Sequence, residues 1–192
     1  MATLLVVHHA PTDSLRRLTD AALAGARHPD IDGVTVRDLP ALAFARDEAD
    51  AGDLLAADGY LLITPANFGF MSGAMKHLFD STFLQIGGAL EAPGGQSGGA
   101  PGHAGRDGHA GRDGTDGTSG TDGTSGTAGR PYGLLVHGRY DTTGAVRSVE
   151  SIVTALKWRP AAQPLAVLGP VDETATAAAY ELGATLAAVL SA

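Results

Sequence analysis

The chain of 192 residues contains no cysteine, and aromatic residues make up only 5% of it, including a single tryptophan. Without cysteine the protein has no disulfide, no thiolate nucleophile and no sulfur ligand for a metal. The composition is compatible with a reducing compartment, and we expect a cytoplasmic protein. The seven histidines are scattered along the chain, so we expect no metal site.

Basic residues are also scarce, because 13 Lys and Arg stand against 21 Asp and Glu and give a net charge of −8. This excess of acid argues against nucleic acid as a partner. No apolar run approaches the roughly 20 residues that span a bilayer. The apolar run after Met1 has no basic leader of the kind a signal peptide carries, so we expect no membrane association. A G-x-S-x-G motif is absent, which disfavours a classical serine hydrolase.

Five short apolar runs alternate with helical patterns along the chain, at residues 3–7, 34–36, 60–63, 132–136 and 164–168. Runs of this length are typical of strands that are buried on both faces of a parallel sheet. The helical patterns cover residues 14–27, at most a short helix within 47–56, and helices that start near residues 72, 143 and 173. The pattern predicts one α/β domain with a five-stranded parallel sheet and right-handed crossovers.

Most of the 27 glycines lie between residues 87 and 130, in a degenerate three-residue repeat that lacks the prolines of collagen. So few side chains in this segment are able to pack that ordering it would cost too much entropy. We interpret residues 87–130 as a disordered, flexible insert within a single domain of residues 1–192. It leaves the carboxyl end of the third helix, on the side away from the carboxyl ends of the strands.

The central stretch, residues 59–80, reads GYLLITPANFGFMSGAMKHLFD. Its apolar run predicts a strand that ends at Thr64 and Pro65, because proline cannot donate to a ladder. A loop over residues 66–71 follows, and Ser72 is suited to cap the next helix. Ligands of open parallel sheets bind at the carboxyl ends of the strands. Phe68 and Phe70 therefore either flank a ligand there or are partly buried in the core.

The string from Thr64 to Lys76 resembles the second flavin loop of the flavodoxin-like NAD(P)H:quinone and FMN reductases, whose pattern is roughly TPxxFGxMSGxMKxFxD. Leu78 stands where that family commonly has phenylalanine. The resemblance implies a three-layer sandwich with strand order 2-1-3-4-5, FMN as the cofactor and NAD(P)H as the electron donor. It also implies a small-molecule acceptor such as a quinone, and a homodimer or homotetramer.

The loop after the first strand begins with two histidines, and His9 is the one we expect to reach the ligand because adjacent strand residues face opposite ways. By itself, a loop that runs into a helix is either an ordinary cap or an anion site. The family's phosphate loop resembles S-x-T-G-x-T, of which this chain keeps Thr12. Ala10, Asp13 and Leu15 replace its serine, glycine and second threonine, so phosphate binding would rest on Thr12, Ser14 and backbone amides.

A third loop, residues 137–144, follows the fourth strand and places Tyr140 where it could stack on a flavin. Together with the resemblance, the three loops predict a set of cofactor-binding residues: His9, Ala10, Pro11, Thr12, Ser14 and Leu15 in the first, Pro65, Ala66, Asn67, Phe68 and Gly69 in the second, and His137, Gly138, Tyr140 and Thr142 in the third.

Three functions remain open at this point. The chain is an FMN oxidoreductase that passes a hydride from NAD(P)H to a quinone or similar acceptor, a flavodoxin-type electron carrier, or a module of the same fold with weak flavin affinity. A carrier presents an acidic rim around its flavin, whereas the second and third loops here are not notably acidic and include Arg139. This favours the oxidoreductase. Because the flavin would carry the chemistry, we name no catalytic residue of the protein.

Overall fold

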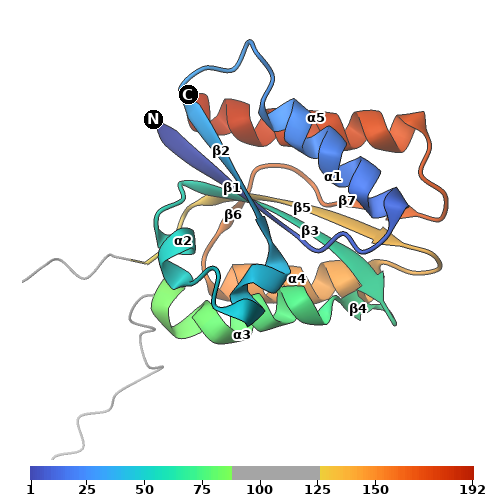
Figure 1. Ribbon diagram of the computed structural model, residues 1–192, viewed down its shortest axis with the longest axis horizontal. Helices are drawn as coiled ribbons and strands as arrows, with labels where there is room; N and C mark the ends of the chain where they lie inside the picture. Colours follow the sequence, from blue (N-terminus) through green and yellow to red (C-terminus); the bar gives the residue numbers. More distant parts are fainter. Residues whose placement is uncertain (88–125) are drawn as a thin grey trace, which may run out of the picture.

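The computed structural model describes residues 1–87 and 126–192, so most of the predicted insert lies outside the described residues (Figure 1). The elements, in chain order, are β1 (Ala2–His8), α1 (Asp13–Ala26), β2 (Val34–Pro40), the 3₁₀ helix η1 (Ala41–Arg46), α2 (Ala51–Leu55), β3 (Gly59–Asn67), β4 (Phe70–Met71), α3 (Gly73–Ile86), β5 (Pro131–Gly138), α4 (Thr143–Ala155), β6 (Arg159–Pro160), β7 (Leu165–Leu168) and α5 (Glu173–Ser191). Among the described helices, none has the length and apolar character needed to cross a membrane.

The main sheet has the order β2-β1-β3-β5, with β6 and β7 both paired to the outer side of β5, and every pairing in it is parallel. The fourth and fifth predicted strands correspond to β5 and β7, so the expected order 2-1-3-4-5 is confirmed. The short β6 and β7 together form one interrupted edge strand along β5.

Helices cover both faces of the sheet, which gives three layers (Figure 1). Leu4 and Val6 of β1 pack towards α1 and α5 on one face, and Leu5 and Val7 pack towards α3 and α4 on the other. All four side chains are fully buried. The unbroken apolar runs of the sequence are therefore explained by a sheet that is covered on both faces, and the predicted α/β sandwich is confirmed.

The central strand runs further than predicted, because β3 continues through Pro65 to Asn67. Pro65 lies opposite His137 in the parallel register and lacks only an amide donor, so it does not end the strand. The chain then reverses and Phe70–Met71 pairs antiparallel with Ala66–Asn67, where the sequence predicted only a loop. The 3₁₀ helix at residues 41–46 was also not predicted.

The edge of the sheet at the amino ends of the strands is fastened by a buried polar cluster. The ring of Trp158 stacks on that of Tyr60 at a centroid distance of 3.9 Å, which places this tryptophan in the core. Its indole nitrogen donates to the hydroxyl of Thr127 at 2.7 Å, and the backbone N–H of Thr127 donates to the carbonyl of Ile86 at 3.0 Å. Packed structure thus resumes before Pro131, which is earlier than the sequence suggested.

Candidate functional site

The carboxyl ends of the strands meet at one edge of the sheet, at the right of Figure 1, where α1 begins and the β3–β4 hairpin projects. The loops at this edge follow β1, β3, β5 and β7. Three of these loops were predicted to form the site, and the loop after β7 was not. The hydrogen bonds and backbone angles of each loop show which side chains and backbone groups it exposes at this edge.

The hairpin between β3 and β4 presents an aromatic ring to solvent. Phe68 and Gly69 have φ angles of 50° and 75°, as the two central residues of a type I′ turn do. The left-handed region is unfavourable for a bulky residue such as phenylalanine. The side chain of Phe68 has a relative exposure of 109%, so burial in the core does not explain this ring, whereas Phe70, at 48%, is about half buried. Strain of this kind is typical of functional sites.

The hairpin is held from both sides. A Cβ atom added at Gly144, in the first turn of α4, would lie 2.1 Å from the carbonyl oxygen of Gly69, so a glycine is required at this contact. At its base the buried hydroxyls of Thr64 and Ser72 are 3.1 Å apart, and the N–H of Ser72 donates to Thr64 Oγ1 at 3.0 Å. Ser72 also caps α3, as predicted, by accepting from the N–H of Met75.

The third loop places Tyr140 and Arg139 at the same edge. Tyr140 is 81% exposed, and the guanidinium carbon of Arg139 lies 5.4 Å from the centroid of its ring. The carboxylate of Asp141 accepts a hydrogen bond from the N–H of Thr143 at 2.9 Å, which lowers the pKa of Asp141. Asp141 therefore makes the bond at the start of α4, while the side chain of Thr142, a predicted site residue, makes no capping bond.

The first loop is shaped by an arginine that sequence analysis missed. The guanidinium of Arg16 donates to the carbonyls of Ala10 and Pro11, at 3.4 and 3.2 Å, and pairs with the carboxylate of Asp13. Arg16 thus offsets the negative charge that Asp13 brings to the loop. The i,i+3 spacing of the two residues was the available signal.

Two predicted residues of this loop act through their place at the start of α1. The hydroxyl of Thr12 accepts from the N–H of Leu15 at 3.3 Å, so Thr12 is the N-cap. Leu15 lies in the first turn of α1 with its side chain fully buried, so it takes part in the cap only through its backbone N–H. A hydroxyl that accepts one hydrogen bond still has its own proton to donate, and Thr12 is exposed.

The three histidines at this edge have different surroundings. His8 lies beside Asp38, with 3.0 Å between Nε2 and the carboxylate oxygen. Burial, followed by the neighbouring His8, lowers the pKa of His9, so its neutral form predominates at pH 7. His137 Nε2 donates to the carbonyl of Gly169 at 2.9 Å and ties β5 to the loop after β7.

A pocket of about 400 Å³ joins the first and third loops to the loop after β7, and its lining residues are Thr12, Ser14, His137, Arg139, Gly169 and Pro170. Of these, Thr12, Ser14 and His137 were predicted to bind the cofactor, and Arg139 is the basic residue of the third loop. The predicted residues of the second loop lie outside it: Pro65 is buried in β3, Ala66 is half-buried, and Asn67, Phe68 and Gly69 are in the hairpin. Gly138 is buried, with no room for a side chain beside Asp141, Thr142 and Ala66.

Comparison with known proteins agrees with this architecture. No family model matches the chain. A flavodoxin of Aquifex aeolicus is 31% identical over 91 residues, which are 47% of this chain and 45% of that protein, so the match spans less than half of the curated relative. The structure of a flavodoxin from the domain Archaea superposes with a TM-score of 0.65 at 10% identity and 98% coverage of both chains. This chain has a flavodoxin-like fold.

A second structure of the same fold is described as a flavodoxin, WrbA-like protein from Agrobacterium tumefaciens. It superposes with a TM-score of 0.58 at 13% identity, covering 99% of this chain and 98% of that one. At such identities the similarity establishes the fold and leaves the activity to be argued from the site itself.

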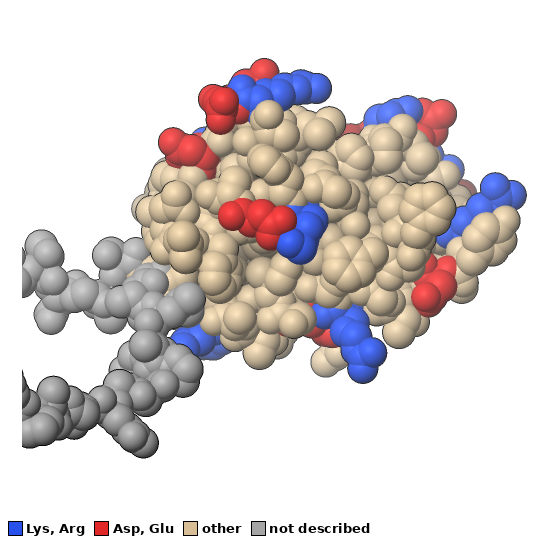
Figure 2. Space-filling model, turned by 90° about the horizontal axis from the view of Figure 1, so that it is seen from below, with Lys and Arg blue, Asp and Glu red and all other residues tan. Residues whose placement is uncertain are grey.

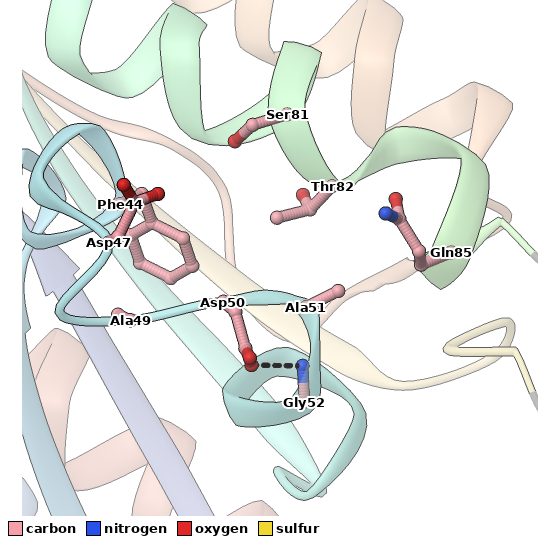
Figure 3. A pocket seen from close by; sticks show the side chains of 9 residues that line it. All are labelled: Phe44, Asp47, Ala49, Asp50, Ala51, Gly52, Ser81, Thr82 and Gln85. Atoms are coloured by element: carbon pink, nitrogen blue, oxygen red, sulfur yellow. Dashed lines mark hydrogen bonds between the residues drawn. The ribbon is translucent and has the colours of Figure 1, made fainter.

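A second hollow of this flavodoxin-like chain, of about 350 Å³, lies between the η1–α2 segment and the carboxyl-terminal half of α3 (Figure 3). It includes the carboxylates of Asp47 and Asp50, and Asp50 is already bonded to the N–H of Gly52 at 2.7 Å. Ser81 and Thr82 donate their hydroxyls to carbonyls of their own helix. The hollow is separate from the carboxyl edge, and its polar groups are largely used within the fold.

Proposed function

We propose that this chain binds FMN at the carboxyl edge of its sheet and passes electrons from NAD(P)H through it to a small acceptor such as a quinone. The observation that carries the proposal is the pair of exposed rings, Phe68 in a left-handed backbone conformation and Tyr140 on the next loop. Stacking on a flat heteroaromatic ring is a use for such rings that accounts for both the exposure and the strain.

The residues at this edge fit the two ends of FMN. The aromatic rings of the hairpin and third loop suit the isoalloxazine, and the pocket with Thr12, Ser14 and Arg139 suits a phosphate. When bound, FMN would supply the hydride and electron transfer. The protein would bind and orient it, and the neutral His9 would add no charge to the first loop.

Charge at the edge supports an oxidoreductase. Arg139 is exposed there, and Asp13 is paired with Arg16. Such an edge accepts an anionic pyridine nucleotide more readily than an acidic rim does. A flavodoxin-type carrier is the second candidate, and its support is the similarity to the Aquifex aeolicus and archaeal flavodoxins.

Steady-state oxidation of NADH and NADPH by the FMN-loaded protein, with a soluble quinone as acceptor, distinguishes these two functions. An oxidoreductase consumes either nucleotide at a rate that saturates with both substrates. If nucleotide is consumed only after a separate flavodoxin reductase is added, the chain is a carrier.

We also propose that the protein forms a homodimer or homotetramer. Much of the surface over α3 and α4 carries neither acidic nor basic side chains (Figure 2). Leu84 of α3 is 80% exposed, and Phe70 beside this layer is 48% exposed. Light scattering over micromolar concentrations measures the assembly, and a monomer throughout would remove this proposal.

A further inference from the structure

Three arginines lie around the carboxyl edge, and the structure uses them differently. Arg16 bonds two carbonyls and the carboxylate of Asp13. Arg17 donates to the carbonyl of Val171 at 3.4 Å. Arg139 makes no ion pair with any described residue and rests over the ring of Tyr140. Its donors are therefore the ones available to a ligand.

Arg139 also lies where an anion would be accommodated. It lines the pocket of about 400 Å³ together with the hydroxyl-bearing Thr12 and Ser14. The guanidinium group presents a rigid fork of donors that matches two oxygens of a phosphate. Thr12 keeps its hydroxyl proton while it caps α1. A dianion in this pocket would meet one cation and two hydroxyl donors.

We propose that Arg139 is the residue that recognises the phosphate of the bound mononucleotide, in place of the hydroxyl donors that Ala10 and Leu15 do not provide. This inference rests on the proposed FMN function and deepens it, because it names the group that distinguishes FMN from riboflavin. The ligand chemistry is a phosphate monoester dianion. Because Arg139 and Tyr140 are adjacent, the same loop would hold the phosphate and one face of the flavin ring.

Calorimetric titration of FMN and of riboflavin into the apo-protein tests this, with Arg139→Gln, Arg139→Lys and the wild type in parallel. Arg27→Gln is the matched control, since Arg27 is an exposed arginine at the carboxyl end of α1, at the opposite end of the helix from Thr12. The control removes the same charge from the molecule but leaves the pocket of Arg139 intact.

We expect Arg139→Gln to weaken FMN binding by roughly 10- to 150-fold, the range for a lost hydrogen bond to a charged group. Riboflavin affinity should stay within about twofold, which is small beside that range. Arg139→Lys should fall between Gln and the wild type because it keeps the charge and loses the fork. Inorganic phosphate should compete with FMN in the wild type but not with riboflavin.

Equal weakening of FMN and riboflavin by Arg139→Gln would overturn the inference, because Arg139 would then act through the ring of Tyr140. Unchanged FMN affinity would also overturn it, and a raised KM for NADPH alone would assign the arginine to the phosphate of the dinucleotide instead. If the wild type binds neither flavin, the proposed function itself fails, and the inference falls with it.

Discussion

At the scale of single residues, Gly144 and Gly69 decide where the hairpin lies. The Cβ position at Gly144 is 2.1 Å from a backbone oxygen, whereas nothing lies within 4 Å of the Cβ position at Gly73, in the first turn of α3. A methyl group at Gly144 would therefore displace the backbone of the hairpin, whereas a methyl group at Gly73 would displace nothing, although both glycines lie at the start of a helix beside the hairpin.

Gly144→Ala is therefore expected to push the hairpin away from α4 and move Phe68. An overpacked contact costs about 1–3 kcal/mol, so FMN and riboflavin should both bind more weakly by roughly 5- to 150-fold. Gly73→Ala is the control, with unchanged affinity and a helix stabilised by up to about 1 kcal/mol. Fluorescence titration of both flavins measures this. Wild-type affinity in Gly144→Ala would show that the hairpin position is not part of the site.

The sequence predicted those residues whose role depends on a short, contiguous motif. Thr64, Ser72 and Gly69 were all within the flavin-loop pattern, and their contacts account for it. Arg16 was missed because its role depends on where its side chain folds back, to the carbonyls of the preceding loop. The hydrogen bond between the hydroxyls of Thr64 and Ser72 was likewise visible only in the structure.

At the scale of elements, the strand β3 connects the site to the opposite end of the sheet, where Tyr60 is buried. The Tyr60 hydroxyl donates to the carbonyl of Leu54 at 2.7 Å and accepts from Arg130 at 3.0 Å. Arg130 also donates to the carbonyls of Leu54 and Leu55 at the end of α2. The phenol and guanidinium thereby join α2, β3 and β5.

Burial raises the pKa of Tyr60 from 10.0 to about 12, although Arg130 opposes the shift. The stabilisation by the neutral phenol is complete below pH 10 and is lost as the pH rises through 12. Chemical denaturation should show a loss of roughly 2–3 kcal/mol over this range, at about 1.4 kcal/mol per pKa unit. Tyr60→Phe should be less stable at pH 8 and lack this component of the alkaline decline. An identical decline in the variant would contradict the assignment.

Apolar runs predicted the strands well because the sheet is covered on both faces. The apolar runs predicted the ends of the strands less well. β3 continues past Pro65, and the fifth strand is divided into β6 and β7. Ala166 and Leu168 of β7 are exposed at the edge of the sheet. The 3₁₀ helix η1 followed directly on β2 and was too short to show a helical period.

At the scale of the whole molecule, the strand order came from the resemblance, since periodicity along the chain cannot tell which strands are neighbours. The structure adds a direct contact between Ile86 and Thr127, two described residues on either side of the glycine-rich stretch. Thr127 is fully buried, and its N–H and hydroxyl both donate to the carbonyl of Ile86 at 3.0 Å. The two described ends of that stretch are therefore joined directly.

Deletion of residues 97–125 should leave the melting temperature and flavin affinity nearly unchanged, because Thr127 keeps its contacts. Extending the deletion through Thr127 would leave the indole N–H of Trp158 without its partner. An unsatisfied buried donor costs about 1–3 kcal/mol, and each kcal/mol lowers the melting temperature by about 2–4 °C in a chain of this size. Equal melting temperatures for the two deletions, measured by calorimetry, would refute this role of Thr127.

The central claim is that FMN binds at the carboxyl edge between Phe68 and Tyr140. Its most direct test is calorimetric titration of FMN into the apo-protein and into Phe68→Ala, Tyr140→Ala and Val189→Ala, the last being an exposed apolar control on α5, away from the carboxyl edge. We predict one FMN per chain, with affinity lowered by roughly 5- to 150-fold in each aromatic variant, as for the loss of about 1–3 kcal/mol of stacking, and unchanged in the control. Absence of saturable binding to the wild type, or binding that neither aromatic substitution weakens, would contradict the account.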